Sequence, residues 1–124
     1  GGDGVLQNTL DALQVAARTP PGMTVNVLTG IAFISNMPLA LYQNVELLPI
    51  TAPTTHPRID LVQAGLSDWS FTIREGEEAA VPIPPEPDED SLPLARIHLR
   101  PGMTSIKNSD DGINGYIEDT RTLL

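Results

Sequence analysis

The sequence contains no cysteine among its 124 residues, which excludes a disulfide framework and a thiolate metal site. It has no apolar run that approaches the roughly 20 residues of a membrane-spanning helix, so we expect no membrane insertion. Aromatic residues are also few: one tryptophan, two tyrosines and two phenylalanines are present. A core of this size would bury most of these rings, so few remain for binding ligands.

Basic residues are scarce as well. Seven lysines and arginines accompany 16 aspartates and glutamates, so the formal net charge is -9 and the sequence pI is about 4.3. Nucleic-acid binding requires a basic face that meets the phosphates, and this composition disfavours it. Binding to an anionic membrane surface is disfavoured for the same electrostatic reason. We therefore expect neither nucleic acid nor a membrane among the partners.

The chain is long enough for one structural unit with one core. Twelve prolines and ten glycines separate short runs that are rich in β-branched residues. Short strands about every 10 residues are typical of sandwiches and barrels. The sequence thus predicts a mainly-β chain, an antiparallel β-sandwich or barrel-like domain over residues 20–124. One N-terminal helix, within residues 1–19, and a proline-rich acidic arm complete the predicted architecture.

The segment Val5–Ala17 carries the strongest helix pattern. Its apolar stripe has spacings of three and four residues and consists of Leu6, Leu10, Leu13 and Ala17. A helix of about 13 residues is marginal in isolation, so the stripe must pack against another surface. That surface is either the β domain or the same stripe in other subunits. The three leucines are therefore candidate interface residues.

The central stretch Thr55–Val62 predicts a strand with one buried face. Pro57 favours an extended conformation of the residue before it, and the chain then alternates between polar and apolar residues. Arg58 and Asp60 are two positions apart, so their side chains project from the same face and can pair. We interpret them as a structural ion pair. The alternative is a catalytic or ligand-binding role.

The segment Glu75–Asp90 contains seven of the 16 acids and four of the 12 prolines. Proline cannot occupy a central strand, so we expect an extended surface arm. Its prolines Pro82, Pro84 and Pro85 are candidate contacts with a neighbouring subunit. The following stretch, Leu92–Leu99, has apolar residues at both odd and even positions near its middle. This mixed pattern predicts a strand that is buried on both faces.

The sequence contains no serine elbow, phosphate loop or zinc-helix motif, so we expect no enzyme and no cofactor. Its acids are concentrated in the proline-rich arm, where solvated carboxylates would keep ordinary pKa values. Trp69 and Tyr42 are candidates for stacking against a sugar ring, although Trp69 fits a core strand more simply. The alternative function is therefore a carbohydrate-binding, receptor-binding module.

Six short motifs follow one another along the chain: PGMTVNV at Pro21–Val27, THPRIDLV at Thr55–Val62, GEEAAVPIPP at Gly76–Pro85, LPLARI at Leu92–Ile97, TSI at Thr104–Ile106 and IEDTR at Ile117–Arg121. Their span is nearly the whole chain, roughly residues 20–121. In this order, the motifs resemble a structural domain of tailed-bacteriophage tail fibres and baseplates.

The resemblance implies a virion structural protein that serves as an oligomeric attachment or connector module. Its location would be the virion tail, after assembly in the host cytoplasm. The implied partners are further copies of the chain in a homotrimer, other phage tail proteins and, for the alternative function, a host surface glycan. The residues of Ile31–Ile50 independently favour self-association, because they include more apolar side chains than one face of a small sheet can bury.

Overall fold

The computed structural model of the protein describes residues 3–6, 11–65 and 70–124. These residues form strands and no helix, so the prediction of a mainly-β chain is confirmed. In particular, this part of the chain has no helix that could cross a membrane. The strands are β1 (Gly4–Leu6), β2 (Val15–Ala17), β3 (Val25–Val27), β4 (Gly30–Ile34), β5 (Met37–Leu41), β6 (Val45–Glu46), β7 (Arg58–Gly65), β8 (Phe71–Arg74), β9 (Ser91–Leu99), β10 (Ile106–Lys107) and β11 (Gly115–Asp119).

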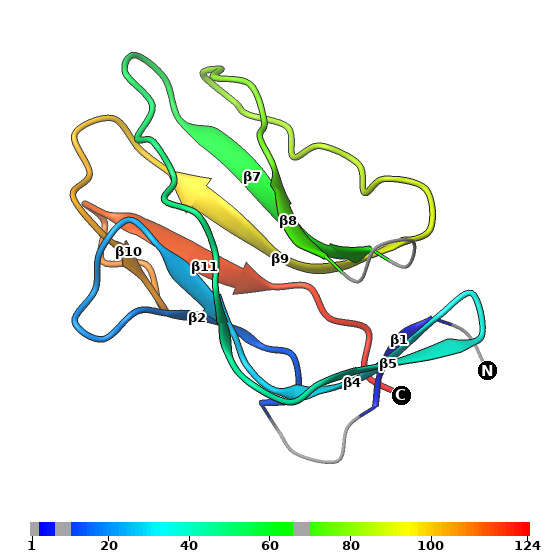
Figure 1. The fold of residues 1–124 in the computed structure, drawn as a ribbon. Coiled ribbons are helices and arrows are strands. Elements are labelled where there is room, and N and C mark those ends of the chain that lie inside the picture. The colour runs from blue at the N-terminus through cyan, green and yellow to red at the C-terminus, as the bar shows by residue number, and fades with distance from the viewer. Residues whose placement is uncertain (1–2, 7–10, 66–69) are drawn as a thin grey trace.

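The strands form three sheets that share one core (Figure 1). The largest sheet has the strand order β10-β11-β9-β7-β8, and the two smaller sheets have the orders β1-β4-β5 and β2-β3-β6. Their pairings are antiparallel except for that of β10 with β11. Val5, Val27 and Ile97 come from different sheets and belong to the same buried cluster. Burial of apolar surface therefore stabilises the three sheets together.

The predicted N-terminal helix over Val5–Ala17 is wrong. Its described residues form β1, which pairs with β4, and β2, which pairs with β3. Leu13 lies between these strands with a φ of 52°, a left-handed conformation that cannot continue an α-helix. The strands bury Val5 and Val15 in the core. A short helix has little intrinsic stability, so this tertiary burial decides the local structure.

A tight hairpin joins β4 to β5. Ser35 and Asn36 both have positive φ, 49° and 65°, as a two-residue type I′ turn requires. The pair Ile34–Met37 flanks the turn, and Phe33–Pro38 is the next pair along the ladder. Alternate antiparallel pairs leave their amides pointing outward, so Pro38 occupies a position where no ladder hydrogen bond is lost. Proline is tolerated there because β5 is an edge strand.

Strand β7 is buried along both of its faces, not only one as the sequence pattern indicated. On one face, Val62 packs into the shared core. The other face carries Gln63, whose side-chain amide exchanges two hydrogen bonds with Asp88, at 2.7 and 2.9 Å. Asp88 belongs to the segment 75–90, which we call the arm and which contains no strand or helix. The arm thus covers the face of β7 that points away from the core.

The mixed apolar pattern of β9 has a structural cause other than simple burial on both faces. The register with β7 shifts at this point, since Val62 pairs with Ala95 while Gln63 pairs with Pro93. Leu94 is the extra residue of a β-bulge, which interrupts the regular alternation of side chains. Both Leu94 and Ala95 are buried as a result.

Gly76 lies where the chain leaves β8 and passes close to β7. A Cβ atom at this position would lie 2.1 Å from the carbonyl oxygen of Ile59. We expect Gly76→Ala to lower the melting temperature by about 5–10 °C, since the backbone must move to relieve this clash. Thermal unfolding followed by circular dichroism measures the change.

Gly22→Ala is the matched control for this substitution. The nearest atom to a Cβ at Gly22 is the flexible end of Arg18, at an ordinary contact distance of 3.5 Å. Equal melting temperatures for the two variants would contradict the close approach at Gly76.

Candidate functional site

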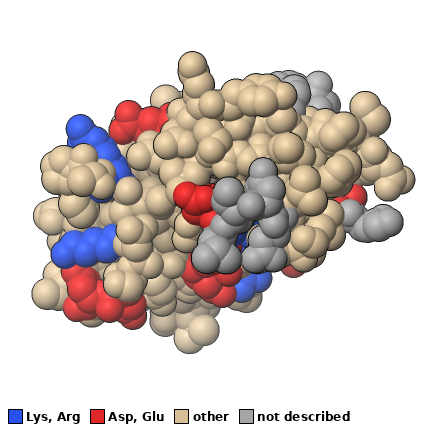
Figure 2. Space-filling model, turned by 90° about the horizontal axis from the view of Figure 1, so that it is seen from below, with Lys and Arg blue, Asp and Glu red and all other residues tan. Residues whose placement is uncertain are grey.

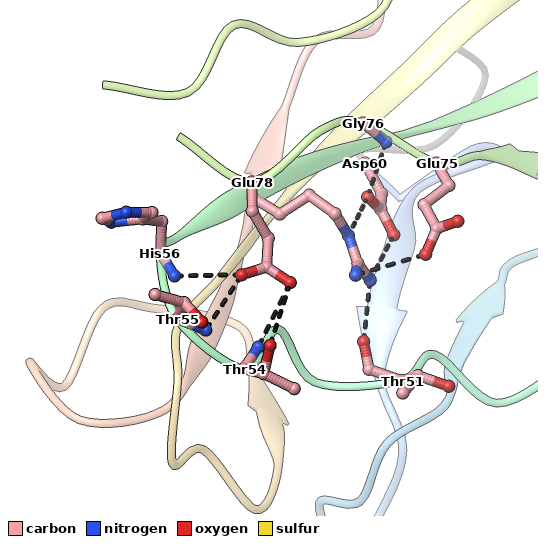
Figure 3. A network of polar contacts seen from close by, with 9 residues as sticks. Thr51, Thr54, Thr55, His56, Asp60, Glu75, Gly76 and Glu78 are labelled. Atoms are coloured by element: carbon pink, nitrogen blue, oxygen red, sulfur yellow. Dashed lines mark hydrogen bonds and ion pairs between the residues drawn. The ribbon is translucent and has the colours of Figure 1, made fainter. Parts of the chain in front are cut away.

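The guanidinium of Arg58 makes four polar contacts, and its partners Thr51, Asp60 and Glu75 are labelled in Figure 3. Its Nε donates to Oδ1 of Asp60 at 2.9 Å, and its Nη2 donates to Oδ2 of the same carboxylate at 3.2 Å. Nη2 also donates to the carbonyl oxygen of Thr51 at 2.7 Å. Nη1 forms an ion pair of 3.2 Å with Glu75. The structure thus brings together the two residues that the sequence pattern paired, and adds two partners.

The Arg58–Asp60 pair is removed from solvent. The two residues are 6% and 2% exposed, whereas the Glu75 side chain is 67% exposed. Asp60 also accepts a hydrogen bond of 3.0 Å from the Gly76 amide. The pair therefore satisfies most of its own hydrogen-bonding capacity, as buried charges must. Thr51, Glu75 and Gly76 were not found by sequence analysis, because no local spacing relates them to Arg58.

A groove opens beside this ion pair. It has a volume of about 400 Å³ and lies between the segment Leu47–Thr51 and the strands β7 and β8. Ile50, Phe71 and Ile73 contribute apolar surface, and Leu48 stands at the rim with 83% of its surface exposed. The remaining lining residues are Leu47, Pro49, Thr51, Arg58, Asp60, Thr72 and Glu75. We call this feature the groove.

Glu78, in the arm, holds the turn that precedes β7. Its carboxylate accepts hydrogen bonds from the backbone amides of Thr54, Thr55 and His56, at 3.3, 2.9 and 3.0 Å (Figure 3). The backbone amide of His56 has the largest effect, followed by those of Thr55 and Thr54. These donors favour the ionised carboxylate and lower the pKa of Glu78 to about 2. The amide of Ala79 adds a bond of 3.1 Å to the carbonyl of Pro57. The start of the arm is thus attached to the chain before β7.

The candidate interface prolines Pro82, Pro84 and Pro85 are half-buried in the arm of their own chain. Pro85 and the exposed residues Val81 and Ile83 line a second hollow of about 370 Å³, with residues Arg74–Ala79 opposite them. The arm therefore folds back along its own first residues.

The sheet β1-β4-β5 is apolar on both sides, and its three strands contain no charged residue. Val5, Ala32 and Leu39 are buried beneath it. The opposite side has a cross-strand row of Leu6, Ile31 and Ala40 and, beside it, a row with Phe33 and Pro38. We call these last five residues the outer face.

The outer face is accessible to solvent. Leu6 is 37% exposed, Pro38 is exposed, and the other three residues are half-buried. Leu124, which is 49% exposed, lies beside Gly4 of β1 and extends the apolar surface. Figure 2 shows the underside of the molecule, and the charged residues visible there lie mostly toward the left and centre of the view.

The other sequence-predicted residues have mixed placements. Leu13 is 1% exposed and belongs to the core, so it presents no surface to a neighbour. Leu10 and Trp69 lie outside the described residues. Tyr42 follows β5 and is 87% exposed. The alternative interpretation as a carbohydrate-binding module therefore depends on Tyr42 alone among the described residues.

Comparisons with family models, with curated proteins and with solved structures find no similar protein. Within the described part of the chain, no group of three or more histidine, aspartate or glutamate side chains is arranged to hold a metal ion. The candidate site therefore consists of three features: the groove with its buried ion pair, the arm, and the outer face.

We predict that Arg58→Ala lowers the free energy of unfolding by about 3–5 kcal/mol, because it leaves the Asp60 carboxylate buried without its partner. Chemical denaturation measures the change. Arg18→Ala is the control, since Arg18 pairs with Glu46 at 3.6 Å while both side chains are more than half exposed. Such a surface pair contributes at most about 1 kcal/mol. Similar losses in the two variants would show that the Arg58 pair has no special structural role.

The lowered pKa of Glu78 predicts a pH dependence of stability. The pKa in the folded chain is about 2 and its ordinary value is 4.5, so the ionised carboxylate stabilises the fold above about pH 4.5. This contribution is lost as the pH falls toward 2. Glu78→Gln should therefore have a lower melting temperature than the native chain near pH 6, and the difference should shrink as the pH falls. A difference that stays constant over this range would contradict the assignment.

Proposed function

We propose that this chain is an oligomeric attachment or connector module of a phage tail fibre or baseplate. Two independent arguments support the proposal. The order of the PRID, LPLARI and DTR motifs resembles the structural domains of such tails. The outer face provides a surface through which copies of the chain can associate, and it is the observation that carries the proposal.

The outer face is suited to self-association for an electrostatic reason. Each copy has a formal charge of -9, so approach of two copies is opposed wherever acidic residues face one another. The strands β1, β4 and β5 contain no charge, so contact there brings no like charges into direct opposition. Salt screens the remaining charges beyond about 8–10 Å. Burial of the apolar side chains at roughly 25 cal/mol per Å² then favours association.

A homotrimer is the assembly that we propose. Closed cyclic symmetry buries the same face of every copy and leaves no open end for further growth. Such an assembly is a natural base for a connector, because it presents identical attachment points around one axis. Gold-labelled antibodies against the chain should bind the tails of the phage particles that contain it, and label elsewhere on the particle would contradict a tail location.

We predict a trimer mass in solution and its loss in Leu6→Lys. Light scattering at micromolar concentration and about 0.15 M salt should give three times 13.3 kDa, which is about 40 kDa. Leu6→Lys places an ammonium group in the outer face, where burial without a partner is costly, so the mass should fall to that of a monomer. The substitution also reduces the net negative charge, so greater repulsion between copies cannot explain dissociation.

Ile113→Lys is the matched control. Ile113 is 70% exposed in a loop outside the three strands, and the same charge is introduced there. A native chain that is monomeric under these conditions would overturn the proposed assembly. A trimer that survives Leu6→Lys would place the contact elsewhere.

A further inference from the structure

The arm exposes two large apolar side chains that its own chain does not cover. Val81 is 83% exposed and Ile83 is 80% exposed. The chain on either side of them is attached firmly to the domain. Before them, Glu78 accepts three backbone hydrogen bonds and Ala79 donates one. After them, Arg74 donates to the carbonyl of Glu86 at 2.8 Å and pairs with Asp88 at 2.7 Å.

The segment between these attachments is already organised for binding. The stretch Val81–Pro85 contains three prolines, each of which fixes its own φ. Little conformational entropy therefore remains to be lost when the segment docks on a partner. The same stretch has five carbonyl acceptors but only two backbone N–H donors, those of Val81 and Ile83. A surface that receives it should offer apolar contact together with hydrogen-bond donors.

The groove has these properties. Its volume of about 400 Å³ falls in the usual range of binding pockets, roughly 300–1,000 Å³. Ile50, Phe71 and Ile73 provide apolar walls, and the hydroxyl group of Thr51 can act as a donor to a carbonyl oxygen.

The end of the arm and the groove lie on opposite faces of the β7–β8 pair. Asp88 is bonded to Gln63, whereas the groove contains Asp60, and residues 60 and 63 differ in parity along β7. Successive side chains of a strand point to opposite faces, so this end of the arm is separated from the groove of its own copy by the sheet, whereas Glu75 at the start of the arm lines that groove.

We propose that Val81 and Ile83 of one copy insert into the groove of a second copy. The contact uses two different surfaces and is therefore heterologous, and a heterologous contact is compatible with a closed ring of three copies when its rotation is about 120°. This inference rests on the proposed self-association and names a second contact within it, separate from the outer face. The arm thus acts as a clasp between neighbouring subunits.

The test compares the dissociation of three full-length proteins by sedimentation equilibrium: the native chain, Val81→Ser/Ile83→Ser and the control Ile113→Ser. Both exposed sites tolerate serine without loss of core packing, and Ile113 is an equally accessible apolar side chain outside the arm. The arm variant should dissociate at a concentration at least about tenfold higher than the native chain, because two buried aliphatic contacts are lost. The control should dissociate like the native chain.

A second measurement identifies the receiving surface. A synthetic peptide with the sequence of residues 79–87 is titrated into the arm variant, whose own arm can no longer compete. The methyl NMR signals of Leu48, Ile50 and Ile73 should shift. A peptide with serine at positions 81 and 83 should leave them unchanged.

The outcomes separate this inference from the proposed function. The native chain could be a trimer while the arm variant dissociates at the same concentration. This result would overturn the contact between arm and groove and leave the outer-face contact intact. Peptide-induced shifts away from the groove would also overturn it, since the arm would then have a different receiver. A native monomer that nevertheless shows groove shifts with the peptide would overturn the trimer but support the contact between arm and groove.

Discussion

The burial of one guanidinium group is the constraint on which much of the structure depends. Arg58 is an obligate cation with five N–H donors, and its removal from water is costly unless acceptors surround it. Those acceptors come from three separate parts of the chain: Thr51 before β7, Asp60 on β7 and Glu75 after β8. The charge of Arg58 therefore fixes the relative positions of three parts of the chain: the segment Leu47–Thr51 beside the groove, strand β7 and the start of the arm. Gly76 is the residue after Glu75, and its backbone amide donates a further hydrogen bond to Asp60. This bond holds the chain close to β7 at Gly76.

Charged and apolar surfaces are divided between different parts of the molecule. Two acids of the arm bind groups of their own chain. Glu78 accepts hydrogen bonds from the turn before β7, and Asp88 is bonded to Gln63 and Arg74. The sheet β1-β4-β5, by contrast, is free of charge on both sides. In a chain of charge -9, contact between copies through such a sheet would bring no like charges of its strands into opposition. The arm adds Val81 and Ile83, two exposed apolar residues held between polar attachments.

Local signals in the sequence predicted the β-rich fold, the Arg58–Asp60 contact and an arm without regular structure, since alternation, residue parity and proline each act over a few positions. Signals that depend on distant partners were misread. Leu6 and Leu13 have helical spacing, yet pairing of the flanking strands with β3 and β4 determines their structure. The apolar pattern of β9 reflected a bulge opposite β7, and no property of β9 alone reveals it. Glu78 resembled a solvated acid, because the amides that it binds lie more than 20 residues earlier in the chain.

The pairing of β1 with the final residues has a mechanical consequence. Val5 donates to the carbonyl of Thr122 at 2.7 Å and accepts a bond of 2.9 Å from Leu124, and the two segments run parallel (Figure 1). Tension that pulls the chain outward from residue 3 and from residue 124 acts in opposite directions along these two parallel segments. Both hydrogen bonds then resist sliding at the same time, whereas an antiparallel pair pulled from one end would open one bond after another. The segments β1 and 122–124 are thus joined in a shear geometry, in which both hydrogen bonds bear the load together.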